Sequence, residues 1–185
     1  MKIAVSGSIG SGKSTVCQYL REKGYDVFDC DEVNRELLEE GKAGWLAVKE
    51  AFPDCFDEGS LNKGKLSARI FGDENEKRKL ESIMHPLILA QLNERDDDPL
   101  FAEVPLLFEA GWEIYFDLNV IVVTDFDLLI ERLAERGMTE NEAIRRLTAQ
   151  MDISEKIKRA DKIIYNNGSL TDLYRLVDDW LAEIL

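Results

Sequence analysis

Cysteine, histidine and proline are scarce in this chain of 185 residues, which holds three, one and four of them. The cysteines (Cys17, Cys30 and Cys55) are odd in number and form no C-x-x-C pair. This argues against disulfides or zinc and favours a reducing, cytoplasmic location. No apolar run approaches the roughly 20 residues of a membrane-spanning helix, so we expect no membrane partner. The chain begins directly with a strand-like segment, and we expect no signal peptide.

Positive charge is also in short supply, with 23 Lys and Arg residues against 37 Asp and Glu residues, a net charge of −14. Such a surface repels polyanions, so we expect no nucleic-acid partner. The length suits one domain, or one core with an insertion. We expect a monomer or a small homo-oligomer. Any anionic substrate requires the few basic residues to gather in one cleft.

The most informative segment that is present is a glycine-rich loop. Residues 7–14 read GSIGSGKS, which matches the G-x-x-x-x-G-K-[ST] pattern between a strand-like run and a helical one. This is the context of a phosphate-binding P-loop. Backbone N–H groups would converge on phosphate, Lys13 would reach the β- and γ-phosphates, and Ser14 would hold Mg²⁺. A glycine turn that binds nothing is the alternative, but it does not require Lys-Ser at a helix start.

Five short runs, most of them apolar throughout, predict strands. They are Ile3–Val5, Tyr25–Phe28, Phe101–Leu107, Leu118–Val123 and Lys162–Tyr165. Continuous apolar runs indicate strands buried on both faces of a parallel sheet. Helical patterns separate them, as in doubly wound α/β domains. We therefore predict an α/β fold, a P-loop NTPase-type doubly wound five-stranded parallel sheet. Gly24 is expected to end the first helix. Capping boxes at Thr139 and Ser169 predict the starts of two later helices, the first of which should end near Met151.

Residues 32–99 exceed what one crossover helix needs. Their patterns predict several helices, with Pro86 opening one of them after a break at His85. We expect a helical insertion at 32–99 that carries the second substrate's site. The nucleotide-binding core would then comprise residues 1–31 and 100–185.

Asp29 and Asp31 end the second predicted strand. Residues two apart on a strand face the same side, and ligands bind at the carboxyl ends of such strands. Both carboxylates are therefore expected beside the P-loop, where one would act as base and the other in the outer shell of the metal. Alternatively, one or both cap the helix that follows at Glu32.

Arginines cluster downstream of the P-loop. Arg132 and Arg136 are four residues apart and share a helix face, and Arg146 follows on the next helix. We predict a lid at about 132–152 whose arginines neutralise charge on the transferring phosphoryl group. The alternative is a solvated face of ion pairs with nearby glutamates. Glu109, after a buried strand, either points into the cleft or is a helix N-terminal acid.

Taken together, these segments resemble the dephospho-CoA kinase family along nearly the whole chain. His-Pro and Pro-Leu-Leu-Phe-Glu are its more specific motifs, whereas the P-loop is shared more widely. Ser8 departs from the family's usual glycine. The segments that carry the resemblance are Gly7–Thr15, Asp29–Asp31 with Arg35, Leu80–Pro86, Val104–Glu109, Arg132–Arg136, Arg146–Gln150 and Ala160–Gly168.

The resemblance implies a role for each matching position. Asp31 would be the base, with Lys13 and Arg136 the other catalytic residues. The implied ATP contacts are Gly10, Ser11, Gly12, Lys13, Ser14, Thr15, Arg136 and Asn167, with Mg²⁺ on Ser14. The implied acceptor contacts are Asp29, Arg35, His85, Glu109, Arg132 and Arg146.

The activity that the resemblance implies is ATP-dependent phosphorylation of the ribose 3′-hydroxyl of dephospho-CoA, the final step of coenzyme A synthesis. ATP and dephospho-CoA would be the partners and Mg²⁺ the cofactor. Another small-molecule P-loop kinase shares the loop but does not explain the His85-Pro86 insertion. A GTPase-type nucleotide switch is the third alternative, and it lacks a clear Asn-Lys-x-Asp motif.

Overall fold

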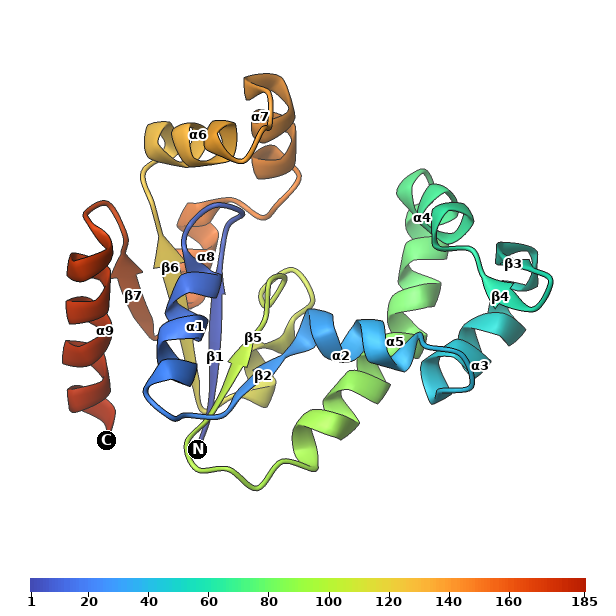
Figure 1. The fold of residues 1–185 in the computed structure, drawn as a ribbon, viewed down its shortest axis with the longest axis horizontal. Helices are drawn as coiled ribbons and strands as arrows, with labels where there is room; N and C mark the ends of the chain where they lie inside the picture. Colours follow the sequence, from blue (N-terminus) through green and yellow to red (C-terminus); the bar gives the residue numbers. More distant parts are fainter. The chain divides into compact units, whose positions relative to one another are not determined.

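The computed structural model describes residues 1–185. The chain divides into two compact units (Figure 1). Unit 1 comprises Met1–Asp29 and Asp97–Leu185, and unit 2 comprises Cys30–Asp96. Unit 2 begins two residues before the insertion expected at 32–99 and ends three residues before it does. No helix is both long and apolar enough to cross a membrane.

Unit 1 is built on a parallel sheet with the strand order β2-β5-β1-β6-β7. The strands are β1 (Lys2–Gly7), β2 (Val27–Asp29), β5 (Leu100–Glu103), β6 (Leu118–Val123) and β7 (Lys162–Tyr165). All four pairings are parallel, and β1, β5 and β6 are buried almost throughout. The predicted doubly wound fold is confirmed. β1 lies where the strand order reverses, which is where ligands bind in such sheets.

Helices cover the sheet and extend past its edge. The core cluster joins β1, β5 and β6 to α1 (Lys13–Glu22) and α9 (Leu170–Ile184), with Trp180 almost fully buried. α8 (Ile153–Arg159) contacts β6. α6 (Phe126–Glu135) and α7 (Glu140–Thr148) pack on each other beyond the P-loop edge of the sheet (Figure 1). A short 3₁₀ helix, η2 (Trp112–Tyr115), precedes β6.

Helix ends follow the local sequence closely. Gly24, with φ 91°, ends α1 as expected, and its N–H donates to Arg21 O. Both predicted capping boxes form, at Thr139 with Glu142 and at Ser169 with Asp172. α7 ends at Thr148 rather than near Met151, and the separate helix α8 was not predicted.

Unit 2 is mostly helical. Its elements are α2 (Cys30–Leu37), α3 (Ala43–Ala51), η1 (Pro53–Cys55), the hairpin β3 (Phe56–Asp57) and β4 (Ser60–Leu61), α4 (Lys63–Phe71) and α5 (Glu74–Asn93). α5 contacts the other three α-helices of the unit and buries Met84, Ile88 and Leu92.

The predicted helix break at His85 is wrong, because α5 runs unbroken with Pro86 inside it. An interior proline costs a helix about 3 kcal/mol or more. Met84, Ile88 and Leu92 form one buried stripe that continues past the proline. Burying a large apolar side chain contributes about 1.5–3 kcal/mol, so three of them outweigh the local cost.

Two strand boundaries also differ from the prediction. The second strand starts at Val27 rather than Tyr25, and β5 ends at Glu103 rather than Leu107. Pro105 has no N–H to give to a neighbouring strand. The chain accordingly leaves the sheet and turns, with Ala110 N–H donating to Leu106 O at 3.0 Å.

Candidate active site

The P-loop joins β1 to α1 and presents an uncapped helix start. Gly12, with φ 94°, precedes α1, no side chain caps the helix, and its first turn has no acid. A Cβ at Gly12 would lie 2.2 Å from Asn166 Nδ2, so no larger residue fits there. Ser11 Oγ is buried without a hydrogen-bond partner. Uncapped N–H groups and the helix dipole make this end of α1 a site for an anion.

Glu103, at the end of β5, binds both polar side chains at the start of α1. Lys13 Nζ donates to Glu103 Oε1 at 2.5 Å, and Ser14 Oγ donates to the same oxygen at 2.7 Å. The Glu103 side chain is 7% exposed. Burial raises the pKa of this carboxyl, but the hydrogen bonds from Lys13 and Ser14 and the charge of Lys13 outweigh that effect and hold the pKa below its ordinary value. Glu103 is therefore an anion beside the P-loop.

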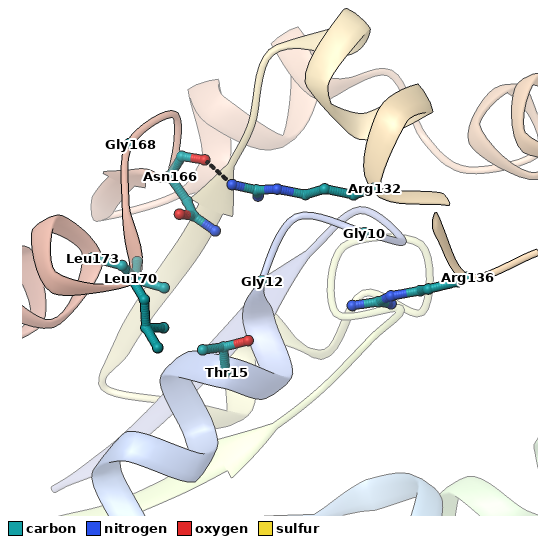
Figure 2. Close-up of a pocket in the computed structure, with 9 residues that line it drawn as sticks. All are labelled: Gly10, Gly12, Thr15, Arg132, Arg136, Asn166, Gly168, Leu170 and Leu173. Carbon is teal, nitrogen blue, oxygen red and sulfur yellow. Dashed lines mark hydrogen bonds between the residues drawn. The ribbon is translucent and has the colours of Figure 1, made fainter. Parts of the chain in front are cut away.

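A cavity of about 200 Å³ opens beside this loop. Its lining comes from the P-loop, α1, the lid helix α6 and the segment joining β7 to α9 (Figure 2). Arg132 of α6 and Arg136 at the C-cap of that helix both line it, opposite Leu170 and Leu173 of α9. A cavity with glycines on one side, arginines above and apolar side chains at one end suits a molecule that has phosphates and a flat apolar ring.

The two lid arginines differ in what they contact. Arg132 donates to Thr124 Oγ1 at 3.2 Å and to the carbonyl oxygen of Asn166 at 3.1 Å, and Figure 2 shows it pointing toward Asn166. Arg136 is exposed, and its guanidinium group has no hydrogen-bond or ion-pair partner within the protein. Arg132 thus holds the cavity wall together, whereas Arg136 is available to a ligand.

Asn166 and Thr124 tie the ends of β6 and β7 to the P-loop. Asn166 Nδ2 donates to Ser11 O at 2.8 Å, and Thr124 Oγ1 lies 3.0 Å from Ser11 O. Both residues are buried. The side chain of Asn167 turns elsewhere and accepts the Asp125 N–H at 2.9 Å. Asn166, rather than Asn167, therefore lines the cavity.

The expectation that Asp29 and Asp31 share a strand face is wrong. β2 ends at Asp29, and α2 begins at Cys30, so Asp31 lies in the first turn of a helix. An acid in a first helical turn is favoured by the helix dipole, and this draws the chain out of the strand. Asp29 pairs in register with Glu103 across β2 and β5, which places it at the P-loop edge of the sheet.

The remaining predicted residues are spread over both units. Arg35 is exposed in the last turn of α2, and His85 is half-buried on α5. Burial lowers the pKa of His85, and the negative charge of Glu81 only partly offsets this. In unit 1, Arg146 is exposed on α7, and Glu109 accepts the Met151 N–H at 3.1 Å.

The sequence interpretation did not single out Glu103, Thr124, Asn166 or Gln150 as site residues. Glu103 did have a signal, since it is the one charged residue inside the apolar run Leu100–Leu107. Thr124 directly follows a buried strand, at the sheet edge where polar groups gather. Gln150, whose side chain reaches the P-loop, carries no local signal.

This arrangement defines a class of protein, the P-loop phosphotransferases with a parallel sheet and a helical lid. A phosphate-binding loop lies at the topological switch point, a Lys and a Ser stand at the helix start, and lid arginines face a cavity beside them. Phosphoryl transfer depends mainly on positioning and charge stabilisation, and groups of these kinds are suited to both.

Comparison with known proteins identifies the family within this class. The family model described as dephospho-CoA kinase matches residues 1–172. A dephospho-CoA kinase of Sulfurimonas denitrificans is 38% identical, over 98% of this chain and 93% of that one. This chain belongs to the dephospho-CoA kinase family.

Solved structures with similar folds support the same family assignment. A crystal structure of a Thermus thermophilus protein is similar with a TM-score of 0.86 at 35% identity, covering 100% of this chain and 98% of that one. Dephospho-CoA kinase from Campylobacter jejuni has a TM-score of 0.73 at 28% identity, over 100% and 98% of the two chains.

Proposed function

We propose that this protein transfers the γ-phosphoryl group of ATP to the ribose 3′-hydroxyl of dephospho-CoA, with Mg²⁺ bound at the P-loop. As a member of the dephospho-CoA kinase family, the protein is a kinase that acts in the final step of coenzyme A synthesis. The observation that carries the proposal is the arrangement at the P-loop. Lys13 and Ser14 both donate hydrogen bonds to Glu103, and two lid arginines line the cavity beside them.

The nucleotide takes the P-loop and the cavity beside it. Backbone N–H groups from Gly10 to Thr15 surround the phosphates, and Lys13 moves from Glu103 to the β- and γ-phosphates. The base takes the apolar end of the cavity near Leu170, with Asn166 in the cavity wall and Asn167, the next residue, bonded to the Asp125 N–H. Arg136, which has no partner of its own, offsets charge on the moving phosphoryl group.

The residues at the start of α1 suit Mg²⁺. Ser14 Oγ and the Glu103 carboxylate lie 2.7 Å apart, and both are hard oxygen ligands of the kind that Mg²⁺ prefers. No three His, Cys, Asp or Glu side chains gather as a metal site, and Mg²⁺ typically keeps its waters and binds through one or two protein oxygens and substrate phosphates. When bound, the ion neutralises charge on the phosphates.

We propose four residues that act on the acceptor, namely Asp31, Arg35, His85 and Arg146. Asp31 lies in the first turn of α2, the helix that follows β2, two residues after Asp29 at the P-loop edge. We assign Asp31 as the base that orients the acceptor hydroxyl and takes its proton. Arg35 and Arg146 are exposed cations suited to the pyrophosphate of the acceptor. His85 is the proposed contact on α5.

The protein works in the cytoplasm under this proposal. Its three cysteines are all buried and free, as is usual for proteins of reducing compartments. Its net charge of −14 also favours solubility. We propose a monomer or a small homo-oligomer.

A coupled kinase assay tests the function. ATP with dephospho-CoA is expected to turn over with a kcat/KM far above that of any nucleoside, nucleotide or small alcohol in a panel, and GTP is expected to be a poorer donor. NMR of the product should place the new phosphate on the ribose 3′-oxygen. Turnover of a nucleoside instead would identify a different small-molecule kinase, and GTP binding without transfer to any acceptor would identify a switch.

A further inference from the structure

The segment between α7 and α8 is attached to two other parts of unit 1. The N–H of Ile9 in the P-loop donates to Gln150 Oε1 at 3.2 Å. The N–H of the next residue, Met151, donates to Glu109 Oε1 at 3.1 Å. Two consecutive residues at the end of the lid therefore bind the phosphate loop and the turn after β5.

The Ile9 contact is unusual for a P-loop. N–H groups of such a loop normally point at phosphate, but this one is taken by a side chain 141 residues away in the sequence. The partner must be the amide oxygen of Gln150, because a backbone N–H only donates. A neutral amide accepts this bond without adding negative charge beside bound phosphates. Gln150 thus fixes the loop one residue before Gly10.

The Met151 contact is fixed by an ion pair between Glu109 and a buried lysine. Glu109 Oε1 lies 2.6 Å from Lys156 Nζ, and the Lys156 side chain has no exposed surface. No other group satisfies this ammonium. Releasing a buried charge from its counterion is strongly destabilising. Glu109 is therefore tied to α8 and supplies a rigid acceptor for Met151.

The lid also contacts the P-loop where it begins. A Cβ at Gly10 would come within 3.3 Å of Leu133 on α6, so this helix packs directly on the loop. The lid thus contacts two adjacent P-loop residues. The start of the lid, at Leu133, packs on Gly10, and the end of the lid, at Gln150, bonds Ile9.

We propose that Gln150 is a positioning residue that couples the lid to the phosphate loop, with Glu109 as the anchor that keeps Gln150 in reach. A phosphate that orders the P-loop also orders the C-terminal end of the lid, because the Ile9–Gln150 hydrogen bond joins the two. An ordered lid in turn helps to position Arg136. Glu109 then acts through Met151 rather than on the acceptor. The inference rests on the proposed kinase function, since it assigns these residues to the phosphoryl-transfer step.

The first test compares Gln150→Met, which keeps the side-chain length but lacks the acceptor, with Gln150→Glu, which retains an acceptor oxygen. Gln18→Met is the matched control, because Gln18 is exposed and bonds only Glu22 on its own helix. Hydrogen exchange of the Ile9 amide, the ATP Kd without acceptor, kcat and the thermal midpoint are measured on each.

We expect faster Ile9 exchange in Gln150→Met, an ATP Kd raised about 3- to 10-fold and a lower kcat, with an unchanged KM for dephospho-CoA. Gln150→Glu should restore slow Ile9 exchange. Unchanged exchange and kcat in Gln150→Met would overturn the coupling, as would a loss of rate that only follows a lowered thermal midpoint. If the wild type fails to phosphorylate dephospho-CoA, the proposed function fails, while Ile9 exchange and ATP affinity still decide the coupling.

The second test addresses Glu109 with the double variant Glu109→Gln, Lys156→Met. It keeps an acceptor for Met151 and leaves no unpaired buried charge. We expect the KM for dephospho-CoA to stay within about twofold of the wild-type value. A large rise in that KM, with the ATP Kd unchanged, would show that Glu109 contacts the acceptor and would overturn its role as anchor.

Discussion

Lys13 and Glu103 form an ion pair of 2.5 Å at the mouth of the P-loop. Their side chains are 13% and 7% exposed, so the pair is only weakly screened by solvent. The same glutamate oxygen accepts the Ser14 hydroxyl. One carboxylate therefore holds both side chains that we propose as contacts of the nucleotide and its metal ion, so we expect nucleotide binding to redistribute these contacts.

Glu103→Gln should reduce the dependence of ATP affinity on Mg²⁺. The amide keeps an acceptor for Lys13 and Ser14 but removes the negative charge that favours a cation at this site. Without Mg²⁺, ATP should bind more tightly than to the wild type, because a repulsive anion is gone. Calorimetric titration of ATP with and without Mg²⁺ measures this. An equal Mg²⁺ enhancement in both proteins would exclude Glu103 from the cation site.

Asp31→Asn should lose most turnover while nucleotide affinity is retained. A general base typically contributes 10²–10⁴-fold to kcat, and a loss in this range is expected at saturating dephospho-CoA. Asp29→Asn is the comparison, since Asp29 pairs in register with Glu103 and should affect ATP affinity more than kcat. Near-normal kcat in Asp31→Asn with a large loss in Asp29→Asn would reverse the two assignments.

Features encoded by neighbouring residues were predictable from the sequence. The P-loop, the capping boxes at Thr139 and Ser169 and the stop at Gly24 each depend on a few consecutive residues, and the structure confirms them. The apolar strands were found for the same reason, since burial on both faces leaves a continuous signal. The parallel sheet followed from the alternation of strands and helices.

Features that depend on distant contacts were not predictable. Pro86 is a local stop signal, and only the packing of α5 against α2, α3 and α4 overrides it. Asp31 looks like part of a strand until the first turn of α2 is seen. Gln150 is separated from Ile9 by 141 residues, so the sequence around it holds no sign of the contact. Contacts between residues so far apart in the sequence become visible only in the three-dimensional structure.

Arg136→Ala should lower mainly the catalytic rate, whereas Arg132→Ala should lower mainly the stability of the fold. Arg136 has no protein partner, so its removal should leave the thermal midpoint unchanged and lower kcat by about 10³-fold or more. Arg132 donates to Thr124 and Asn166, and its removal should cost about 1–3 kcal/mol of stability. Single-turnover kinetics with thermal unfolding separates them. An Arg136 variant that loses ATP affinity but keeps its rate at saturation would show that Arg136 only anchors the nucleotide.

His85→Ala should raise the KM for dephospho-CoA much more than the KM for ATP, because His85 lies on α5 in unit 2, whereas the P-loop belongs to unit 1. A several-fold ratio between the two effects is expected. The control is Ser82→Ala, an exposed position one turn earlier whose hydroxyl donates to Lys79 O. Unchanged KM values with a lower thermal midpoint would make His85 a structural residue.

Titration of His85 should show a pKa below the ordinary histidine value of 6.5. Burial disfavours the charged ring, and the only charge that opposes this is that of Glu81. The unfolded chain then binds the proton more readily than the folded one, so stability is full above pH 6.5 and falls as the pH drops through the lower, folded pKa. Because His85 is the only histidine, its proton NMR signals follow the titration without assignment, and His85→Gln should flatten the loss of stability between about pH 7 and pH 5. A midpoint at or above 6.5, or equal slopes in both proteins, would contradict a desolvated His85.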